Sequence, residues 1–369
     1  MTNTPAGRFS GRRLYIDWAR GLAVLVMIEA HAFDAWTDPA YRHSITWRNA
    51  VVVAGFAAPL FLWLAGLAVV LAAGRTFERT GRRSAATASV CRRGLEIFLL
   101  AFVFRIQAYL LSPGSSALTI FRVDILNIMG PSIAVAGVVW GLCATSMQRS
   151  IAFTLLATAI GLATPFAYAI SGIDRLPTLL QWYMRHSGEY TTFAVLPWTE
   201  FVFAGAAAGA LIAAAQDERS EDLLHAGLAI AGASLVVIGF YTAARPAVFP
   251  GATFWTTSPT WFAIRVGIMM TMLATLGRIE RRISPPAATA ASPLARLGHS
   301  SLFVYWIHVE LVYGYVSYYW WKALPLWGMA AAYVAFCAAM HGAVILRDRV
   351  VRVWRARLQI VPAPVARQA

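Results

Sequence analysis

The stretch Asp17-Trp-Ala-Arg20-Gly-Leu-Ala-Val-Leu-Val-Met-Ile-Glu29-Ala-His31-Ala-Phe-Asp34 is largely apolar, yet it contains several ionisable side chains. In a helix of about 3.6 residues per turn, Arg20 and His31 are about three turns and roughly 16 Å apart on the same face. Asp17 and Asp34 fall near that face, whereas Glu29 lies nearly opposite. Ionisable groups at membrane depth are costly and normally face a protein interior or a wet cavity. The stretch therefore predicts a transmembrane helix with a polar seam, formed by Asp17, Arg20, His31 and Asp34.

The composition of the 369 residues is typical of a membrane protein. Hydrophobic residues make up 59% and charged residues 13%, whereas about a quarter of a soluble domain is charged. Apolar runs of about 20 residues recur, which is the length a helix needs to span a bilayer. We therefore expect an all-α, polytopic integral membrane protein of about ten transmembrane helices. The expected spans lie near residues 15–36, 49–73, 94–111, 123–143, 150–170, 195–215, 225–243, 260–277, 299–320 and 324–346.

The basic residues set the expected orientation. A net charge of +14 would suit nucleic-acid binding, but the arginines lie in the loops between spans, as cytoplasmic anchors do. With the N-terminus in the cytoplasm, a minority of the basic residues falls on the outside, namely Arg42, Arg48, Arg122, Arg175, Arg185, Arg245 and Lys322. We expect both termini in the cytoplasm, the lipid bilayer and no nucleic acid as partner, and a bacterial cytoplasmic (inner) membrane as the location.

Three regions are expected along the chain: a cytoplasmic segment (1–14), a transmembrane domain (15–346) and a basic cytoplasmic tail (347–369). Segment 284–295, rich in Ser, Pro and Ala, is expected to be a linker before the last two spans. A cleavable signal peptide is an alternative for the N-terminus, because Arg12-Arg13 precedes an apolar stretch. The charges inside that stretch favour a retained helix.

Cysteine usage indicates neither disulfides nor a metal. Cys91, Cys143 and Cys337 are isolated, without the spacing of metal ligands. The chain has no phosphate-binding glycine loop, dinucleotide-binding glycine motif or His-Glu-x-x-His pair. We therefore expect no metal cofactor.

His31 is the candidate for the chemistry. Neutral imidazole is a general base near physiological pH, so it can accept a proton from a hydroxyl or amine that attacks an acyl carbonyl. Asp34, one turn further, could orient the ring and stabilise imidazolium, as the aspartate of a catalytic triad does. The structural alternative is a histidine that hydrogen-bonds to a neighbouring helix.

Arg20 lies nearer the cytoplasmic end of the same seam. A guanidinium there can bind a phosphate or pyrophosphate through paired hydrogen bonds. The alternatives are an ion pair with Asp17, one turn away, or extension of the side chain to the membrane surface.

The fourth span opens with three polar residues, Arg122, Asp124 and Asn127. They could contact substrate, or they could cap the helix and bind a neighbouring one. We favour a structural role for Arg122 and substrate contact for Asp124 and Asn127. Further polar candidates lie in the third span, at Glu96, Arg105 and Gln107.

Two later spans hold ionisable residues. His308 could be a second proton relay or a packing hydrogen bond, and packing is favoured. Arg265 is expected to pair with a carboxylate such as Glu200 or Glu310. The candidates for substrate contact are Asp17, Arg122, Asp124, Asn127 and His308, although a structural role is favoured for Arg122 and His308.

Three stretches resemble the membrane acyltransferase superfamily. Asp17-Trp-Ala-Arg20-Gly-Leu-Ala, followed by Met27-Ile-Glu-Ala-His31, is similar to the opening of its bacterial members. The interval from Arg20 to His31 matches the polysaccharide and peptidoglycan O-acetyltransferase branch. Gly55-Phe-Ala-Ala-Pro-Leu-Phe-Leu-Trp-Leu-Ala-Gly66 and Leu297-Gly-His-Ser-Ser-Leu-Phe-Val-Tyr-Trp-Ile-His308 look closer to the heparan-alpha-glucosaminide N-acetyltransferase-like branch. The resemblance covers spans one to four and nine.

The resemblance implies acyl transfer across the membrane. Acyl-CoA, with acetyl-CoA as the expected donor, would enter from the cytoplasm, and a glycan or lipid-linked sugar would be modified on the far side. His31 would then be the catalytic histidine and Arg20 its partner. The sequence departs from the lysosomal enzymes of that branch, whose catalytic histidine follows the first common helix in a large luminal segment. The nearest equivalent here is His43, or the sequence has none.

Two other functions fit the seam less well. In a proton-coupled transporter, Asp17, His31, Asp34 and Asp124 would form a relay. Transporters often show paired repeats with broken helices in matching positions, and the sequence shows no such repeat. A purely structural membrane protein is disfavoured, because charged side chains inside the membrane cost free energy and would serve no function there.

Overall fold

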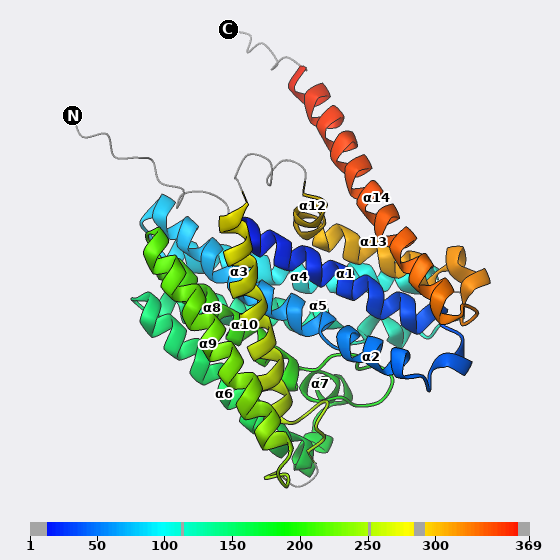
Figure 1. The fold of residues 1–369 in the computed structure, drawn as a ribbon, viewed down its shortest axis with the longest axis horizontal. Coiled ribbons are helices and arrows are strands. Elements are labelled where there is room, and N and C mark those ends of the chain that lie inside the picture. Colours follow the sequence, from blue (N-terminus) through cyan, green and yellow to red (C-terminus); the bar gives the residue numbers. More distant parts are fainter. Residues whose placement is uncertain (1–12, 112–113, 250–251, 284–291, 361–369) are drawn as a thin grey trace. The chain divides into compact units, whose positions relative to one another are not determined.

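The computed structural model describes residues 13–111, 114–249, 252–283 and 292–360. These residues form helices and no extended strand (Figure 1), with isolated backbone bridges joining Thr37 to Leu324 and Val123 to Thr191. The long helices, in chain order, are α1 (Leu14–Trp36), α2 (Ile45–Ala54), α3 (Ala57–Thr80), α4 (Arg83–Leu111), α5 (Ile125–Leu142), α6 (Ser146–Ala169), α8 (Val195–Ala214), α9 (Glu218–Ala243), α10 (Pro259–Arg282), α13 (Ser301–Tyr313) and α14 (Leu326–Ile360). Two short helices, α7 (Thr178–Met184) and α12 (Pro293–His299), lie between them.

Within the described residues, 8 helical segments are long and apolar enough to cross a membrane. They are α4, α5, α6, α8, α9, α10, α14 and the segment Ile45–Thr80, which joins α2 to α3. Each corresponds to an expected span, so the predicted all-α, multi-pass membrane protein is confirmed.

The two other expected spans differ from this pattern. Helix α1 covers the predicted range, but its charged residues Asp17, Arg20, Glu29 and Asp34 are spread along its length. Helix α13 has 13 residues, or about 20 Å at roughly 1.5 Å per residue, which is shorter than the ~30 Å hydrocarbon core. Both of these helices hold candidate site residues.

The break between α2 and α3 has a local cause. The break lies between Gly55 and Pro59: α2 ends at Ala54, and α3 begins at Ala57. Pro59 lies in the first turn of α3, where its missing N–H leaves no hydrogen bond unmade. Most of the expected linker 284–295 lies outside the described residues, and its last part starts α12 at Pro293. Helix α14 runs on into the expected basic tail as far as Ile360.

The chain forms two compact units. Unit 1 contains residues 1–19 and 56–285, and unit 2 contains residues 20–55 and 286–369. The division falls within α1, after Ala19.

Helices of unit 1 approach one another closely at glycines. A Cβ on Gly66 of α3 would lie 1.8 Å from the Val202 carbonyl oxygen of α8, and a Cβ on Gly205 of α8 would lie 1.8 Å from the Trp63 carbonyl oxygen of α3. Both contacts exclude any side chain. Membrane helices use such small residues because close backbone packing replaces the hydrophobic driving force that lipid cannot supply. Helices α9 and α10 also lie side by side in this unit (Figure 1).

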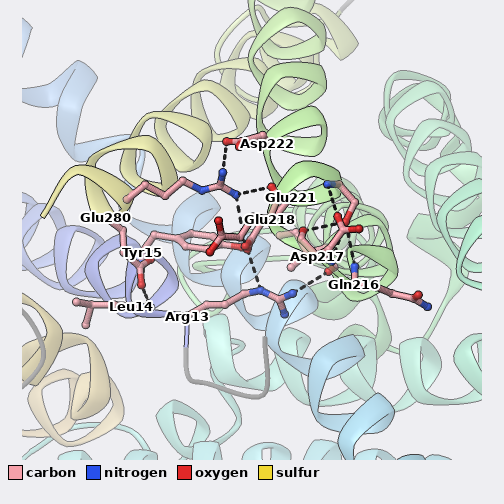
Figure 2. A network of polar contacts seen from close by, with 12 residues as sticks. Arg13, Leu14, Tyr15, Gln216, Asp217, Glu218, Glu221, Asp222 and Glu280 are labelled. Atoms are coloured by element: carbon pink, nitrogen blue, oxygen red, sulfur yellow. Dashed lines mark hydrogen bonds and ion pairs between the residues drawn. The ribbon is translucent and has the colours of Figure 1, made fainter. Parts of the chain in front are cut away.

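A polar network joins the start of α1 to the start of α9 and the end of α10 (Figure 2). The Glu280 carboxylate accepts from the backbone N–H groups of Leu14 and Tyr15, at 3.0 and 2.8 Å. This places a negative charge at the positive end of the α1 dipole. Glu221 is bound by Arg13 at 3.1 Å and by Arg281 at 3.6 Å. These three chain segments were all assigned to the cytoplasmic side, so the network agrees with that topology.

Unit 2 has its own apolar core. Buried Ala32, Ala35 and Trp36 of α1 pack with Val312 of α13 and Met329 of α14. The last carbonyl groups of α1, which have no partner inside the helix, are bound by the segment before α14. Lys322 N–H donates to the Ala35 carbonyl at 2.9 Å, and Leu324 N–H donates to the Trp36 carbonyl at 2.9 Å. These contacts fix the end of the helix that holds His31.

Candidate active site

Two histidines meet in unit 2. Nδ1 of His31 on α1 lies 2.7 Å from Nε2 of His308 on α13. The rings are nearly parallel, with an angle of 15° between their planes and 5.0 Å between their centroids. His308 is fully buried, and its Nδ1 lies 2.8 Å from the Val304 carbonyl oxygen one turn earlier. The packing hydrogen bond predicted for His308 is therefore present, and its partner is the candidate base.

The hydrogen bonds of the two histidines determine which ring nitrogens carry protons. A carbonyl oxygen can only accept, so Nδ1 of neutral His308 carries the proton and donates to Val304. Nε2 of His308 then accepts, and Nδ1 of His31 donates to it. Consequently Nε2 of neutral His31 carries the lone pair. A hydrogen bond at one imidazole nitrogen commonly selects the reactive nitrogen in this way.

Asp34 lies one turn beyond His31 and faces other partners. Its carboxylate oxygens lie 3.3 Å from the Tyr313 hydroxyl and 3.7 Å from a guanidinium nitrogen of Arg42. The Tyr313 ring in turn lies edge-on to the His31 ring, with 5.8 Å between centroids. Asp34 was expected to orient the His31 ring, but the hydrogen bond at Nδ1 of that ring is made by His308. Asp34 reaches the histidine pair through Tyr313.

Two arginines bind adjacent serines at the start of α13. Arg20 of α1 donates to the Ser301 hydroxyl at 3.1 Å, and Arg347 of α14 donates to the Ser300 hydroxyl at 2.8 Å. Both serines are buried. Arg347 also pairs with the carboxylate of the neighbouring Asp348 at 2.6 Å. Guanidinium groups beside the partially positive N-terminus of a helix can bind a phosphate group. We name Arg20, Ser300, Ser301 and Arg347 the arginine–serine cluster.

The remaining candidates lie in unit 1 and have structural partners there. Asp124 pairs with Arg105 at 2.6 Å and accepts from the Ile125 N–H at 2.7 Å, at the start of α5. Asn127 completes that cap by accepting from the Asp124 N–H at 2.9 Å, and it donates to the Tyr183 hydroxyl at 3.3 Å. These contacts are helix capping and helix-to-helix binding, the alternative to the substrate contact that the sequence favoured for both residues.

Other sequence candidates also have structural settings. Arg122 donates to the Thr192 hydroxyl at 3.0 Å, in line with the structural role favoured for it. Glu96 pairs with neighbouring arginines of its own helix. Asp17 is buried in unit 1, while the other members of the polar seam belong to unit 2. His43 is exposed, in the turn before α2.

Sequence reasoning missed four of the residues just described. It placed Arg347 in the basic cytoplasmic tail and gave Tyr313 no role. Ser300 and Ser301 stand inside the motif that carried the resemblance, without a role of their own. They lie eight and seven residues before His308, which is about two helical turns, and that spacing was the available signal.

The chain was also compared with known protein families. The family described as heparan-alpha-glucosaminide N-acetyltransferase, catalytic, matches residues 12–246, which is more than half of the chain. The chain belongs to this family. The match includes Arg20, His31 and Asp34 of α1, and it ends before α13 and α14. A comparison with curated proteins finds no match.

Membership makes the protein one of a family of membrane acetyltransferases, whose members use acetyl-CoA as donor. His308 and Arg347 lie outside the matched residues 12–246. Within the described residues, no group of three or more His, Cys, Asp or Glu side chains is placed to hold a metal ion.

Proposed function

We propose that this protein moves an acyl group, with acetyl as the expected group, from cytoplasmic acyl-CoA to a hydroxyl or amine of an exoplasmic glycan or lipid-linked sugar. His31 acts as the general base. The observation that carries the proposal is the pair of hydrogen bonds that link Val304 to His308 and His308 to His31. They leave Nε2 of His31 with the lone pair that a base needs. Membership of an acetyltransferase family supports the donor and the reaction class.

The chemical step can be written with these residues. The acceptor hydroxyl or amine attacks the thioester carbonyl carbon, and its proton passes to Nε2 of His31. The tetrahedral intermediate then loses the sulfur: the new C–O or C–N bond remains, the C–S bond breaks, and CoA leaves as the thiol after taking up the proton. His308 holds the His31 ring in the required orientation while Nε2 is protonated. Tyr313 and Asp34 add a hydroxyl and a negative charge near the imidazolium.

Arg20 and Arg347 are proposed to bind the phosphates of the donor. Arg20 and His31 are about 16 Å apart along α1, so an elongated donor held at one end can present its thioester toward the other. In the orientation proposed here, the arginine–serine cluster faces the cytoplasm and His31 lies in the outer half of the membrane. The location is a bacterial inner membrane, with residues 1–14 and 347–369 on the cytoplasmic side.

The first experiment measures acetyl-CoA binding and turnover by the purified full-length protein. His31→Ala is compared with His43→Ala, which removes the other candidate histidine from an exposed turn. We expect His31→Ala to bind acetyl-CoA but lose CoA release, while His43→Ala keeps the wild-type rate. Full turnover by His31→Ala would contradict the assignment of the base. If acetyl-CoA binds to neither variant nor to the wild type, the acyltransferase proposal fails, and proton-coupled transport is measured in proteoliposomes.

A further inference from the structure

Helix α14 is longer than a membrane span needs to be. Its apolar part covers residues 326–346 and ends where Arg347 follows Leu346. At roughly 1.5 Å per residue this part is about 31 Å long, which matches the ~30 Å hydrocarbon core of a bilayer. The helix then continues without a break to Ile360 (Figure 1). Residues 347–360, which we name the α14 extension, therefore begin at the lipid head groups, on the side assigned to the cytoplasm.

The α14 extension is strongly basic. Residues 347–357 include five arginines and one acidic residue, Asp348. Arg347 is bound to Ser300 and to Asp348. The other arginines form no ion pair with any residue that the structure describes; they are Arg349, Arg352, Arg355 and Arg357. Their positive charges are thus left for an anionic partner outside the described chain.

Apolar and basic side chains lie on different faces of this helix. With about 100° between successive residues, one face contains Leu346, Val350, Val353 and Trp354. The opposite face contains Arg349, Arg352 and Arg355. The four side chains of the apolar face are 53–63% exposed, so the protein itself does not cover them. A helix with arginines on one face, and tryptophan and aliphatic residues on the other, is typical of segments that lie in the membrane interface.

Three kinds of partner can be compared with these two faces. Nucleic acid would bind the arginines but leave the apolar face in water. A second copy packed along the apolar face would leave the arginines unpaired and bring an equal number beside them. An anionic lipid surface suits both faces, because aliphatic and indole groups can enter the acyl boundary while guanidinium groups bind phosphate oxygens. It is also adjacent, since the apolar part of α14 ends where the extension begins.

We propose that the α14 extension binds anionic phospholipids of the leaflet at which the span ends. The apolar face enters the boundary between head groups and acyl chains, and the unpaired arginines contact the lipid phosphates. The extension reaches the surface by a tilt of α14 or by a bend after its apolar part, the ways in which long helices adapt to a bilayer. The proposal does not depend on acyl transfer or on the arginine–serine cluster.

The test measures lipid binding by the full-length protein in mixed micelles. The probes are fluorescently labelled phosphatidylglycerol, which is anionic, and phosphatidylcholine, which has no net charge. One variant replaces the four unpaired arginines of the extension by glutamine. The matched control replaces four exposed arginines at the end of α3 and the start of α4, assigned to the same side of the membrane; these are Arg75, Arg79, Arg82 and Arg83.

We expect the wild type to prefer phosphatidylglycerol. The extension variant should bind it more weakly, on the order of tenfold or more, while the control variant stays near the wild-type affinity. Trp354→Gln removes part of the apolar face without changing the charge and should also weaken binding. Its control is Trp327→Gln, an exposed tryptophan at the other end of α14.

Three results would overturn the proposal. The first is equal affinity of the wild type for the two lipids. The second is an equal loss in the extension variant and in the control variant, which would mean that positive charge anywhere on this side is sufficient. The third is unchanged affinity in Trp354→Gln, a variant that remains informative if the fourfold replacement does not fold. Displacement of the lipid by double-stranded DNA at equal phosphate concentration would instead assign the arginines to nucleic acid and would contradict the proposal as well.

Discussion

Nε2 of His308 lies 2.7 Å from Nδ1 of His31, although 277 residues separate them in the chain. Because Nδ1 of His308 faces the Val304 carbonyl, the contact selects one tautomer for each ring. It leaves the lone pair of His31 on Nε2. A neutral histidine therefore orients the candidate base here, where catalytic triads use a carboxylate.

Replacing His308 should impair catalysis while donor binding persists. His308→Phe keeps a ring but removes the acceptor for His31, so we expect kcat for acyl transfer to fall about 10²-fold, the lower range of general-base contributions. His308→Gln can accept through its amide oxygen and should recover part of the rate. The acetyl-CoA dissociation constant should stay near the wild-type value in both. Equal kcat in His308→Phe and wild type would show that this contact only packs the helices.

The arginine–serine cluster should govern donor affinity. A charge-assisted hydrogen bond contributes about 1.5–3 kcal/mol, so Arg347→Gln is expected to weaken acetyl-CoA binding about tenfold or more. Arg20→Gln should act similarly. Arg352→Gln, an exposed arginine further along α14, is the matched control. If binding of a short acyl thioester without phosphates is weakened just as much, the arginines do not act on phosphate.

The Arg105–Asp124 pair should matter for stability. Both side chains are mostly buried, at 15% and 13% exposure, and loss of one partner from a buried pair costs about 3–5 kcal/mol. Asp124→Asn keeps a good helix cap but leaves the Arg105 charge unpaired, whereas Asp124→Ala loses both. We therefore expect the thermal unfolding midpoint to fall in the order wild type, Asp124→Asn, Asp124→Ala. Identical midpoints for the two variants would mean that the cap contributes nothing.

The close contact of α3 with α8 predicts intolerance of a methyl group. Gly66→Ala and Gly205→Ala would each place Cβ 1.8 Å from a backbone oxygen, so the helices must separate. The loss should exceed the 1–3 kcal/mol typical of overpacking. Gly74→Ala, also on α3, meets nothing within 4 Å and should be stabilising or neutral, because alanine favours helix. The yield of monodisperse protein and its unfolding midpoint report the difference.

Asp217 predicts a pH dependence outside the spans. This exposed residue caps α9, and the backbone and side-chain hydrogen bonds of Ser220 lower its pKa below the ordinary 3.8. A carboxylate with a lowered pKa stabilises the folded state above its ordinary pKa, and that contribution is lost as the pH falls through the folded-state value. The stability difference between wild type and Asp217→Ala should therefore shrink in acid. A difference that is constant across this range would indicate a pH-independent cap.

The sequence was sufficient to predict the membrane class and most of the spans. Apolar length and helix formation are local properties, because a helix in lipid must satisfy its own backbone hydrogen bonds. The expected spans accordingly match helices of the structure, and the break near Gly55 and Pro59 follows from the same local rules. The weakest match is the ninth span, where α13 ends at Tyr313 before the expected limit.

The candidate site was predicted in part. The helical period placed Arg20 and His31 on one face. It led us to expect that Asp34 orients the His31 ring, whereas His308 makes the hydrogen bond to Nδ1 of that ring. It also favoured substrate contact for Asp124 and Asn127, which cap α5 and bind Arg105 and Tyr183. A polar residue at the start of a helix can serve either purpose, and the identity of its neighbours decides between them.

The sequence by itself determined that this chain crosses the membrane repeatedly and carries ionisable groups at positions where burial is costly. It did so because hydrophobic length and helical period depend on residues close together in the chain. The tertiary structure decided which of these groups meet: His31 with His308, Arg20 with Ser301, and Arg347 with Ser300. Each contact joins different helices, so it depends on how the helices pack and not on the local pattern of either one.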